Sequence, residues 1–340
     1  MKRTILFLVL LILSIVACSA NTAVSSTPNP EVSEVAVTEI ELDGPITNAN
    51  AELSGLGWYG DTLILLPQYP DFSGTETAVY AIPKATIAAY LDGSATDPIT
   101  PIAVPVIVDD LSDRISRFEG YESIDFMGDE AYLTIEASGG GMRAYLIKGT
   151  MAPDLSSLTL DARNLIKIDR QAELGNKSDE ALLVAENQIV TFYEANGVEV
   201  NESPIAHLFN TDLSAAGTTS FPNIPYRVTD VTRLDENGRF WAINYNFPGS
   251  EDVQTDNDPL AQTYGEGTTH AQSDKVERLV EFQYTADGII MVEQAPIQLQ
   301  LLASDDSRNW EGIVRLDDQG FLLVTDKFPT TILGFVPYSE

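Results

Sequence analysis

Asn309-Trp310-Glu311-Gly312-Ile313-Val314-Arg315-Leu316-Asp317-Asp318-Gln319-Gly320-Phe321-Leu322-Leu323-Val324-Thr325-Asp326 is the stretch of sequence that decides the fold. A short apolar run follows Glu311, a turn is expected at Asp318-Gln319-Gly320, and a second apolar run ends on Asp326. Two apolar runs separated by a short segment that contains glycine predict a pair of antiparallel strands.

Four weaker copies of this unit lie upstream, over residues 52–66, 121–136, 179–194 and 229–244. The fourth copy matches best, because Arg233-Leu234-Asp235-Glu236-Asn237-Gly238 aligns with Arg315-Leu316-Asp317-Asp318-Gln319-Gly320. Further strands are expected after the copies, over residues 78–82, 102–108, 143–148, 158–168, 205–210, 279–284, 289–297 and 331–336. Five units of about four strands predict an all-β fold, a five-bladed β-propeller.

The fifth unit ends one strand short of four. The segment Val35 to Leu42 alternates with period two and is predicted to complete the last blade, which would close the ring without an open sheet edge. Six blades with one degenerate member are the main alternative, and a pair of β-sandwiches is a more distant one. Residues 84–91 are predicted to form at most a short helix.

The charge of the chain excludes one class of partner. Its 340 residues include 51 acidic and 19 basic side chains, for a net charge of −32. A nucleic-acid-binding protein needs a cationic face, so nucleic acid is excluded as a partner. The acidity is compatible with divalent cations, with basic partners or with a solvated acidic surface. We expect a monomer whose small-molecule or protein ligand is not identified by the sequence.

The N-terminus has the pattern of a targeting segment. Lys2 and Arg3 precede an apolar run over residues 5–16, and Ile15-Val16-Ala17-Cys18 resembles the cleavage box of bacterial lipoproteins. This pattern predicts a signal peptide and a lipidated Cys18, which is the only cysteine. A plain secretory signal with an incidental cysteine is the alternative.

This interpretation divides the chain into a signal peptide (1–17), a flexible tether (18–33) and a propeller domain (34–340). The protein would then lie in the bacterial cell envelope, held by its lipid on the extracytoplasmic side of a membrane. Ser19 after the cysteine favours the outer membrane if the organism has two membranes, and that choice stays open.

The starts of the five units are polar. The matched positions are Ser54, Glu122, Glu180, Thr229 and Glu311. Since the first strand of each blade lines the channel of a propeller, these side chains are expected to face the axis at one level. Converging carboxylates repel one another unless a cation lies between them, and oxygen ligands without His or Cys suit Ca²⁺. The alternative is that they solvate a water-filled channel or cap the strands.

A second set of polar residues follows four of the five starts by fourteen or fifteen positions. It comprises Glu136, Glu194, Asn244 and Asp326. These side chains are either the lining of a polar mouth or ordinary strand-end residues, and the pattern favours the second interpretation.

The ring of Ser, Glu, Glu, hydroxyl and Glu resembles the calcium-activated nucleotidase (apyrase) family. Glu311-Gly312-Ile313 resembles the closing Glu-Gly-Ile segment of that family, and Tyr121-Glu122-Ser123 resembles its His-Glu-Ser segment. The opening stretch is also similar to the broad group of phytase-like, esterase-like exported bacterial propellers. The resemblance implies a calcium-dependent hydrolase of nucleotides or other phosphate esters.

Phosphate handling usually recruits arginine and lysine. The candidates cluster in the last two units: Arg227, Arg233, Arg239, Arg308 and Arg315. Surface arginines that offset the acidity are the commoner explanation of such a cluster.

Two functions therefore stay open. The first is a lipid-anchored, calcium-stabilised binding or interaction module, and the second is the metal-dependent hydrolase. His207 and His270 are not spaced for a zinc site. The long segment over residues 249–275 is either a lid or partner element or a disordered acidic insertion.

Overall fold

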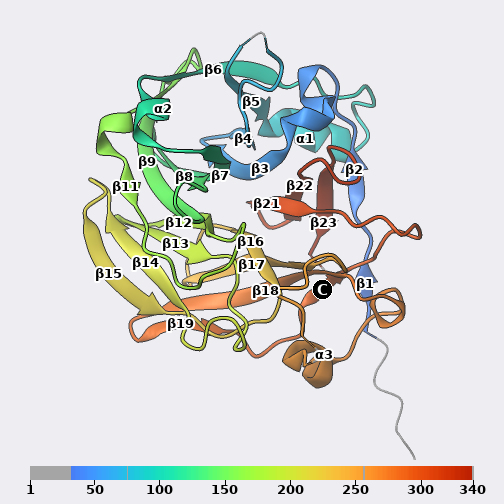
Figure 1. The fold of residues 1–340 in the computed structure, drawn as a ribbon. Coiled ribbons are helices and arrows are strands. Elements are labelled where there is room, and N and C mark those ends of the chain that lie inside the picture. Colours follow the sequence, from blue (N-terminus) through green and yellow to red (C-terminus); the bar gives the residue numbers. More distant parts are fainter. Residues whose placement is uncertain (1–31, 75, 256, 339–340) are drawn as a thin grey trace, which may run out of the picture. The chain divides into compact units, whose positions relative to one another are not determined.

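The structure, a computed structural model, describes residues 32–338 except residues 75 and 256 (Figure 1). The predicted signal peptide, Cys18 and all of the tether before residue 32 lie outside the described residues. Val32, near the end of the predicted tether, forms an isolated parallel bridge to Gly267. The described part is mostly β, with several four-stranded antiparallel sheets, and this is consistent with a β-propeller.

The first two repeat units form two antiparallel sheets that share an outer edge. Their strands are β3 (Leu53–Tyr59), β4 (Thr62–Pro67), β5 (Ala78–Pro83) and β6 (Ile102–Val108), then β7 (Phe118–Met127), β8 (Glu130–Ala137), β9 (Arg143–Met151) and β10 (Leu158–Leu160). Strand β10 pairs in parallel with β6 and joins the two sheets. The single strand predicted over residues 158–168 is wrong, since a 3-10 turn at Ala162–Asn164 separates β10 from β11 (Ile166–Lys167).

The third unit forms a sheet of four strands in sequence order. They are β12 (Asp179–Ala185), β13 (Gln188–Tyr193), β14 (Ile205–Asn210) and β15 (Ala215–Ser220). Strand β15 was not predicted, because its sequence is Ala-Ala-Gly-Thr-Thr-Ser and its side chains are mostly exposed, so it carries no apolar pattern.

The fourth unit consists of β16 (Arg227–Val231), β17 (Arg239–Asn246) and β18 (Val276–Thr285), extended by β19 (Gly288–Met291) and β20 (Ile297–Leu299). Both β19 and β20 pair with β18, at opposite ends. The predicted strand over residues 289–297 is therefore two strands. Their pairing depends on the length of β18, which local sequence does not encode.

The last sheet combines both ends of the chain. It contains β21 (Trp310–Leu316), β22 (Gly320–Thr325), β23 (Leu333–Pro337) and the N-terminal β2 (Thr38–Ile40), which pairs with β23. The N-terminal segment is divided, because β1 (Glu34–Val35) pairs in parallel with β20 of the preceding sheet. The predicted pairing thus holds for residues 38–40 and not for Val35.

Three short α-helices lie between strands: α1 (Lys84–Leu91), α2 (Leu111–Arg114) and α3 (Pro259–Tyr264). Short 3-10 helices are also present: η1 (Pro45–Thr47), η2 (Ala49–Ala51), η3 (Ala162–Asn164) and η4 (His270–Gln272). Helix α1 occupies the range in which a short helix was predicted. Within the described residues, every helix is too short or too polar to span a membrane.

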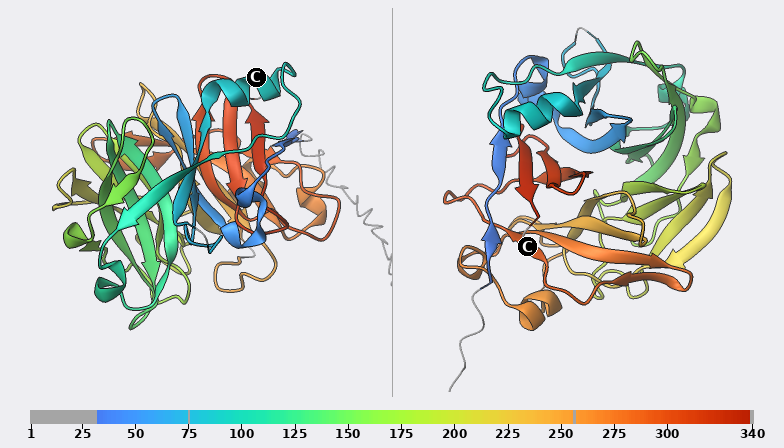
Figure 2. Two further views of the ribbon diagram at one scale, coloured as in Figure 1. Left: turned by 90° about the horizontal axis from the view of Figure 1, so that it is seen from above. Right: turned by 180° about the vertical axis from the view of Figure 1, so that it is seen from behind.

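The first strands of the units contact one another in a closed cycle. Strand β3 contacts β7, β7 contacts β12, β12 contacts β16, β16 contacts β21, and β21 contacts β3 again (Figures 1 and 2). Closure of the cycle brings residues that are far apart in sequence to a common axis. The candidate site is built at one end of these strands.

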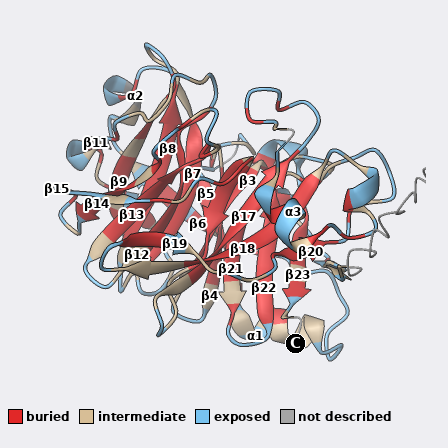
Figure 3. Ribbon diagram, turned by 90° about the horizontal axis from the view of Figure 1, so that it is seen from below, coloured by how far each residue is buried: buried red, intermediate tan, exposed pale blue. Residues whose placement is uncertain are grey.

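The core lies between neighbouring sheets and is the main source of stability. Most strand residues in it are fully buried, as Figure 3 shows. Phe192 of one sheet packs against Phe240 of the next at 5.5 Å between ring centroids, and Trp241 packs edge-on against Phe321 at 5.4 Å. Burial of each such side chain contributes about 1.5–3 kcal/mol. This packing holds the first strands, and hence the site, in fixed positions.

Candidate functional site

Each of the five predicted ring positions coincides with an irregularity in its strand. The register shifts between Leu53 and Gly55, Tyr121 and Ser123, Asp179 and Ala181, Val228 and Val231, and Trp310 and Gly312. Ser54, Glu122, Glu180 and Glu311 are the extra residues of these β-bulges, and Thr229 shares the fourth irregularity with Asp230. A bulge leaves one residue outside the ladder and re-aims its side chain, so the five positions are structurally equivalent.

The two hydroxyl residues of the ring bind the backbone of the next first strand. Ser54 Oγ donates to the Tyr121 carbonyl at 2.6 Å, and Thr229 Oγ1 donates to the Trp310 carbonyl at 2.7 Å. Ser54 also lines the central cavity, whereas Thr229 is buried behind it. Thr229 therefore joins two strands of the cycle and does not face the cavity as expected.

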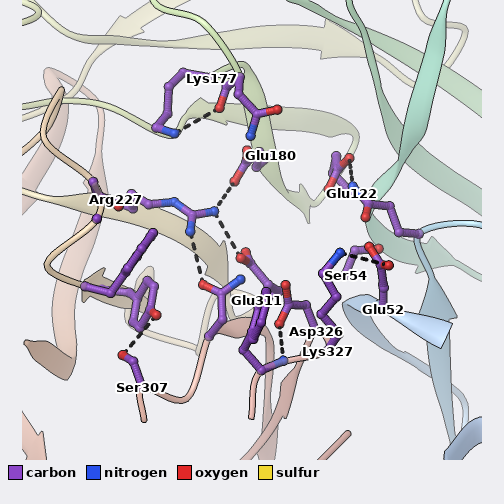
Figure 4. Close-up of a pocket in the computed structure, with 18 of the residues that line it drawn as sticks. Glu52, Ser54, Glu122, Lys177, Glu180, Arg227, Ser307, Glu311, Asp326 and Lys327 are labelled. Carbon is purple, nitrogen blue, oxygen red and sulfur yellow. Dashed lines mark hydrogen bonds and ion pairs between the residues drawn. The ribbon is translucent and has the colours of Figure 1, made fainter. Parts of the chain in front are cut away.

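The cavity has a volume of about 800 Å³ and is strongly acidic (Figure 4). Its carboxylates come from all parts of the cycle: Glu52, Glu119, Glu122, Glu136, Glu180, Asp252, Asp305, Glu311 and Asp326. Its cationic side chains are Lys177, Arg227 and Lys327. Nine acidic side chains against three cationic ones give the lining of this cavity an excess of negative charge.

Arg227 is the most enclosed cation of the cavity. Its guanidinium binds Glu311 Oε1 at 3.0 Å and Glu180 Oε2 at 3.3 Å, and its Nε bonds to Glu194. Asn309 Oδ1 accepts a further hydrogen bond at 3.1 Å. Burial lowers the pKa of Arg227, but Glu311 and Glu180 outweigh it and raise this pKa above its ordinary value. Arg227 thus stays charged and partly neutralises one wall of the ring, where burial still raises the pKa of Glu311 to about 8 and that of Glu180 above its usual value.

The opposite wall has carboxylates without a cationic partner. Glu122 Oε1 accepts a hydrogen bond from Gln68 Nε2 at 3.1 Å, and Glu136 Oε1 is buried without a hydrogen-bond partner in the described structure. Burial, together with the charges of Glu136 and Glu180, raises the pKa of Glu122 well above its usual value. Burial and the charge of Glu180 raise the pKa of Glu136 to about 7, against the lowering effects of Ser178, Lys177 and Arg227. At neutral pH this wall holds either protons or a cation.

The other two cations of the cavity are also paired. Lys177 Nζ donates to the Asn176 carbonyl at 3.0 Å and lies 3.8 Å from Glu194 Oε2. Lys327 Nζ lies 3.0 Å from Glu52 Oε1. Each cationic side chain of the cavity therefore has a carboxylate partner. None of the three is left free to bind an anionic ligand.

The second predicted set separates into two pairs. Glu136 and Asp326 line the cavity, so the favoured interpretation as ordinary strand-end residues does not describe them. Glu194 is fully buried beside Arg227. Asn244 donates to the backbone carbonyls of residues 225 and 227 and accepts from Arg278 Nε at 2.8 Å, which is a structural role.

Of the five arginines singled out in the sequence, Arg227 alone lines the main cavity. Arg308 is buried against Glu277 at 2.8 Å, and Arg239 binds Glu281 at 3.2 Å. Arg233 and Arg315 line a separate cavity of about 310 Å³. The arginines thus do not form one anion site.

Several cavity residues were not identified from the sequence. A signal exists two positions before each ring residue, where Glu52, Gly120, Ser178, Arg227 and Asn309 occur. Three of these, Glu52, Arg227 and Asn309, line the cavity. At Gly120, which has a φ of 142°, a Cβ would lie 2.1 Å from Gln68 Cγ, so the glycine leaves room for the side chain that binds Glu122.

The long segment before β18 contributes to the cavity. Pro248, Gly249, Ser250 and Asp252 line it, and the rest of the segment includes α3. In the described part of the chain, no three His, Cys, Asp or Glu side chains are placed so that they could hold one metal ion together. Binding an ion would therefore require side chains of the acidic wall to turn toward it.

Comparisons with known proteins give similarity of architecture only. No protein-family model matches the chain, and no curated protein matches it. A glucose dehydrogenase structure is similar with a TM-score of 0.44 and 12% identity, covering 89% of this chain and 99% of that one. The soluble aldose sugar dehydrogenase from Escherichia coli in the apo-form has a TM-score of 0.42 and 11% identity, covering 89% and 100%. A mannose phosphorylase from Leishmania mexicana in complex with phosphate ion has a TM-score of 0.44 and 11% identity, covering 89% of each chain.

Proposed function

We propose that this protein is a five-bladed β-propeller that binds Ca²⁺ in its acidic cavity and acts as a binding module. We further propose that it is anchored through a lipid on Cys18 to the extracytoplasmic side of a bacterial membrane. The closed cycle of β3, β7, β12, β16 and β21 supports the blade number. The lipid anchor and the location rest on the sequence pattern of residues 1–18.

One observation carries the calcium proposal. Glu122 and Glu136 are buried, their pKa values are raised, and neither forms an ion pair in the described structure, although the charges of Lys177 and Arg227 lower the pKa of Glu136 from a distance. Arg227 neutralises the wall of Glu311 and Glu194, so the excess negative charge lies on the other side. Carboxylate oxygens of Glu122, Glu136 and Glu180 are ligands that suit a hard divalent cation. The chemistry of these residues suits Ca²⁺, and binding requires their side chains to turn toward one ion, because no three such side chains of the described residues are placed to hold a metal together.

A calcium-dependent hydrolase of phosphate esters or nucleotides is the second candidate. A cavity of about 800 Å³ has room for a substrate beside an ion. Against it, a phosphate needs cationic donors, and Lys177, Arg227 and Lys327 are each paired with a carboxylate. The binding module is therefore the better supported function.

The test is thermal melting of the mature protein in EDTA and in added Ca²⁺. At a hundred times the dissociation constant, binding to the folded state adds about 2.7 kcal/mol, which is several degrees of melting temperature. The Glu122→Gln variant is expected to lose most of this shift. Glu130→Gln is the matched control, because Glu130 lies in the same strand as Glu136 but pairs with Lys148 outside the cavity.

Absence of any Ca²⁺ shift in the unsubstituted protein would overturn the calcium proposal. Assays with ATP and with p-nitrophenyl phosphate separate the two candidates. Calcium-dependent turnover that is lost in Glu122→Gln would favour the hydrolase over the binding module.

A further inference from the structure

The cavity is much larger than a metal ion requires. Its volume of about 800 Å³ compares with about 30 Å³ for one water molecule in the liquid. Beyond the buried carboxylates, its lining includes Phe247 and Phe328, whose exposed fractions are 38% and 56%. Large apolar side chains exposed beside a cavity are typical of a surface that contacts an organic ligand.

The charges of the lining select the class of that ligand. Asp252 and Asp305 also line the cavity and add to its negative charge, and the cations are paired as described. An anion would be repelled by the excess of carboxylates. A neutral ligand such as a sugar would leave Glu122 and Glu136 to be neutralised by protons, whereas a cation can take the place of those protons.

The aromatic rings of this cavity already contact cationic groups. Lys327 Nζ lies 5.7 Å from the centroid of the Phe328 ring, and the Arg227 guanidinium lies 5.7 Å from that of Tyr245. Phe247 stacks on Tyr245 with centroids 6.3 Å apart. Aromatic faces attract cations, so rings and carboxylates of one cavity favour the same kind of ligand.

We propose that the cavity binds an organic cation, with ammonium groups joined by hydrocarbon, as in an aliphatic polyamine. An ammonium group binds the carboxylates of Glu122 and Glu136, including the unpartnered Glu136 Oε1. The hydrocarbon lies against Phe247 and Phe328. This inference rests on the proposed function in one respect, because the organic cation and Ca²⁺ use the same carboxylates and compete.

The test is calorimetric titration of the mature protein with spermidine in EDTA. Binding is expected, and Ca²⁺ is expected to weaken it. The Phe328→Ala variant should bind spermidine about tenfold more weakly, a change of about 1.4 kcal/mol, and should keep the Ca²⁺ melting shift. Phe247→Ala is the second variant. Ile290→Ala is the control, because Ile290 is 51% exposed and does not line the cavity.

The outcomes distinguish this inference from the proposed function. A rise in melting temperature with Ca²⁺ but no binding of spermidine would overturn the organic-cation proposal and leave the calcium proposal standing. Binding of spermidine with no change in melting temperature on adding Ca²⁺ would support the organic-cation proposal and overturn the calcium proposal. Unchanged spermidine affinity in both phenylalanine variants, with melting temperatures that confirm their folding, overturns the assigned contacts. Tighter binding of glucose than of spermidine overturns the ligand class.

Discussion

Replacing Arg227 with methionine tests whether its guanidinium balances the buried carboxylates. The substitution keeps a long side chain beside Tyr245 and removes the charge. It leaves Glu180, Glu194 and Glu311 buried with one cation fewer. Removing one partner of a buried ion pair costs about 3–5 kcal/mol, because the remaining charge is left uncompensated.

This cost converts to a melting temperature. An unfolding entropy of about 2.1 cal/mol/K per residue over roughly 300 ordered residues is about 0.6 kcal/mol/K, so Arg227→Met should melt about 5–8 °C lower. The fall in melting temperature should be smaller at pH 5 than at pH 8, because at pH 5 the carboxylates left without Arg227 take up protons and lose their charge. Calorimetry at both pH values measures it.

Arg239→Met is the matched control. Arg239 also binds a carboxylate, Glu281, whose side chain is 7% exposed, but Arg239 itself is 40% exposed and Arg315 also acts on Glu281, so removing Arg239 should cost about 1 kcal/mol. The control should melt within about 2 °C of the unsubstituted protein. If Arg227→Met melted as high as Arg239→Met at pH 8, the account of Arg227 as the counterion of the ring would be refuted.

Three further predictions concern the acidic wall and its support. In EDTA, the melting temperature should fall as the pH rises from about 4.5 to about 8 and then level off, because burial raises the pKa of Glu136 to about 7 and that of Glu311 to about 8. A carboxyl group whose pKa is raised in the folded state stabilises the fold fully below the pKa of 4.5 that it has in the unfolded state. That stabilisation is lost as the pH rises to the pKa of the folded state. A melting temperature that did not change with pH would contradict this expectation. Glu136→Gln should raise the melting temperature in EDTA, because the amide resembles the neutral carboxyl group, and should reduce the rise that Ca²⁺ causes. A lower melting temperature in EDTA would contradict the interpretation that Glu136 carries a buried charge without an ion pair. Gly120→Ala should cost about 1–3 kcal/mol in urea unfolding, because its φ of 142° disfavours other residues and its Cβ would meet Gln68. Gly60→Ala, with a φ of 56° and nothing within 4 Å, should cost only about 1 kcal/mol, and equal losses would refute the role of Gly120.

Much of the strand pattern could be read locally. The apolar runs that became β3, β4, β21 and β22 carry their own signal, because most residues of each run are buried on both faces of the sheet and the runs are therefore almost continuously apolar. Strand β15 has no such signal, and β19 and β20 depend on pairing with β18. The division of the N-terminus between two sheets likewise depends on neighbours that lie far along the chain.

The candidate site shows the same division between local and distant information. Matching the repeats was enough to find Ser54, Glu122, Glu180 and Glu311, because each equivalent first strand bulges at the same point. The metal role of these residues stays a prediction. Matching could not show that Thr229 turns to the Trp310 carbonyl, since that acceptor comes from another sheet.

The sequence by itself determined the β-rich repeat, the equivalent polar starts and the excess of acid over base. Only the tertiary structure decided how that charge is distributed. Closing the cycle of strands places Arg227 among Glu180, Glu194 and Glu311, and leaves Glu122 and Glu136 facing the same cavity without an ion pair in the described structure. The physical reason is that a pKa depends on burial and on charges a few ångströms away, and these neighbours come from different sheets.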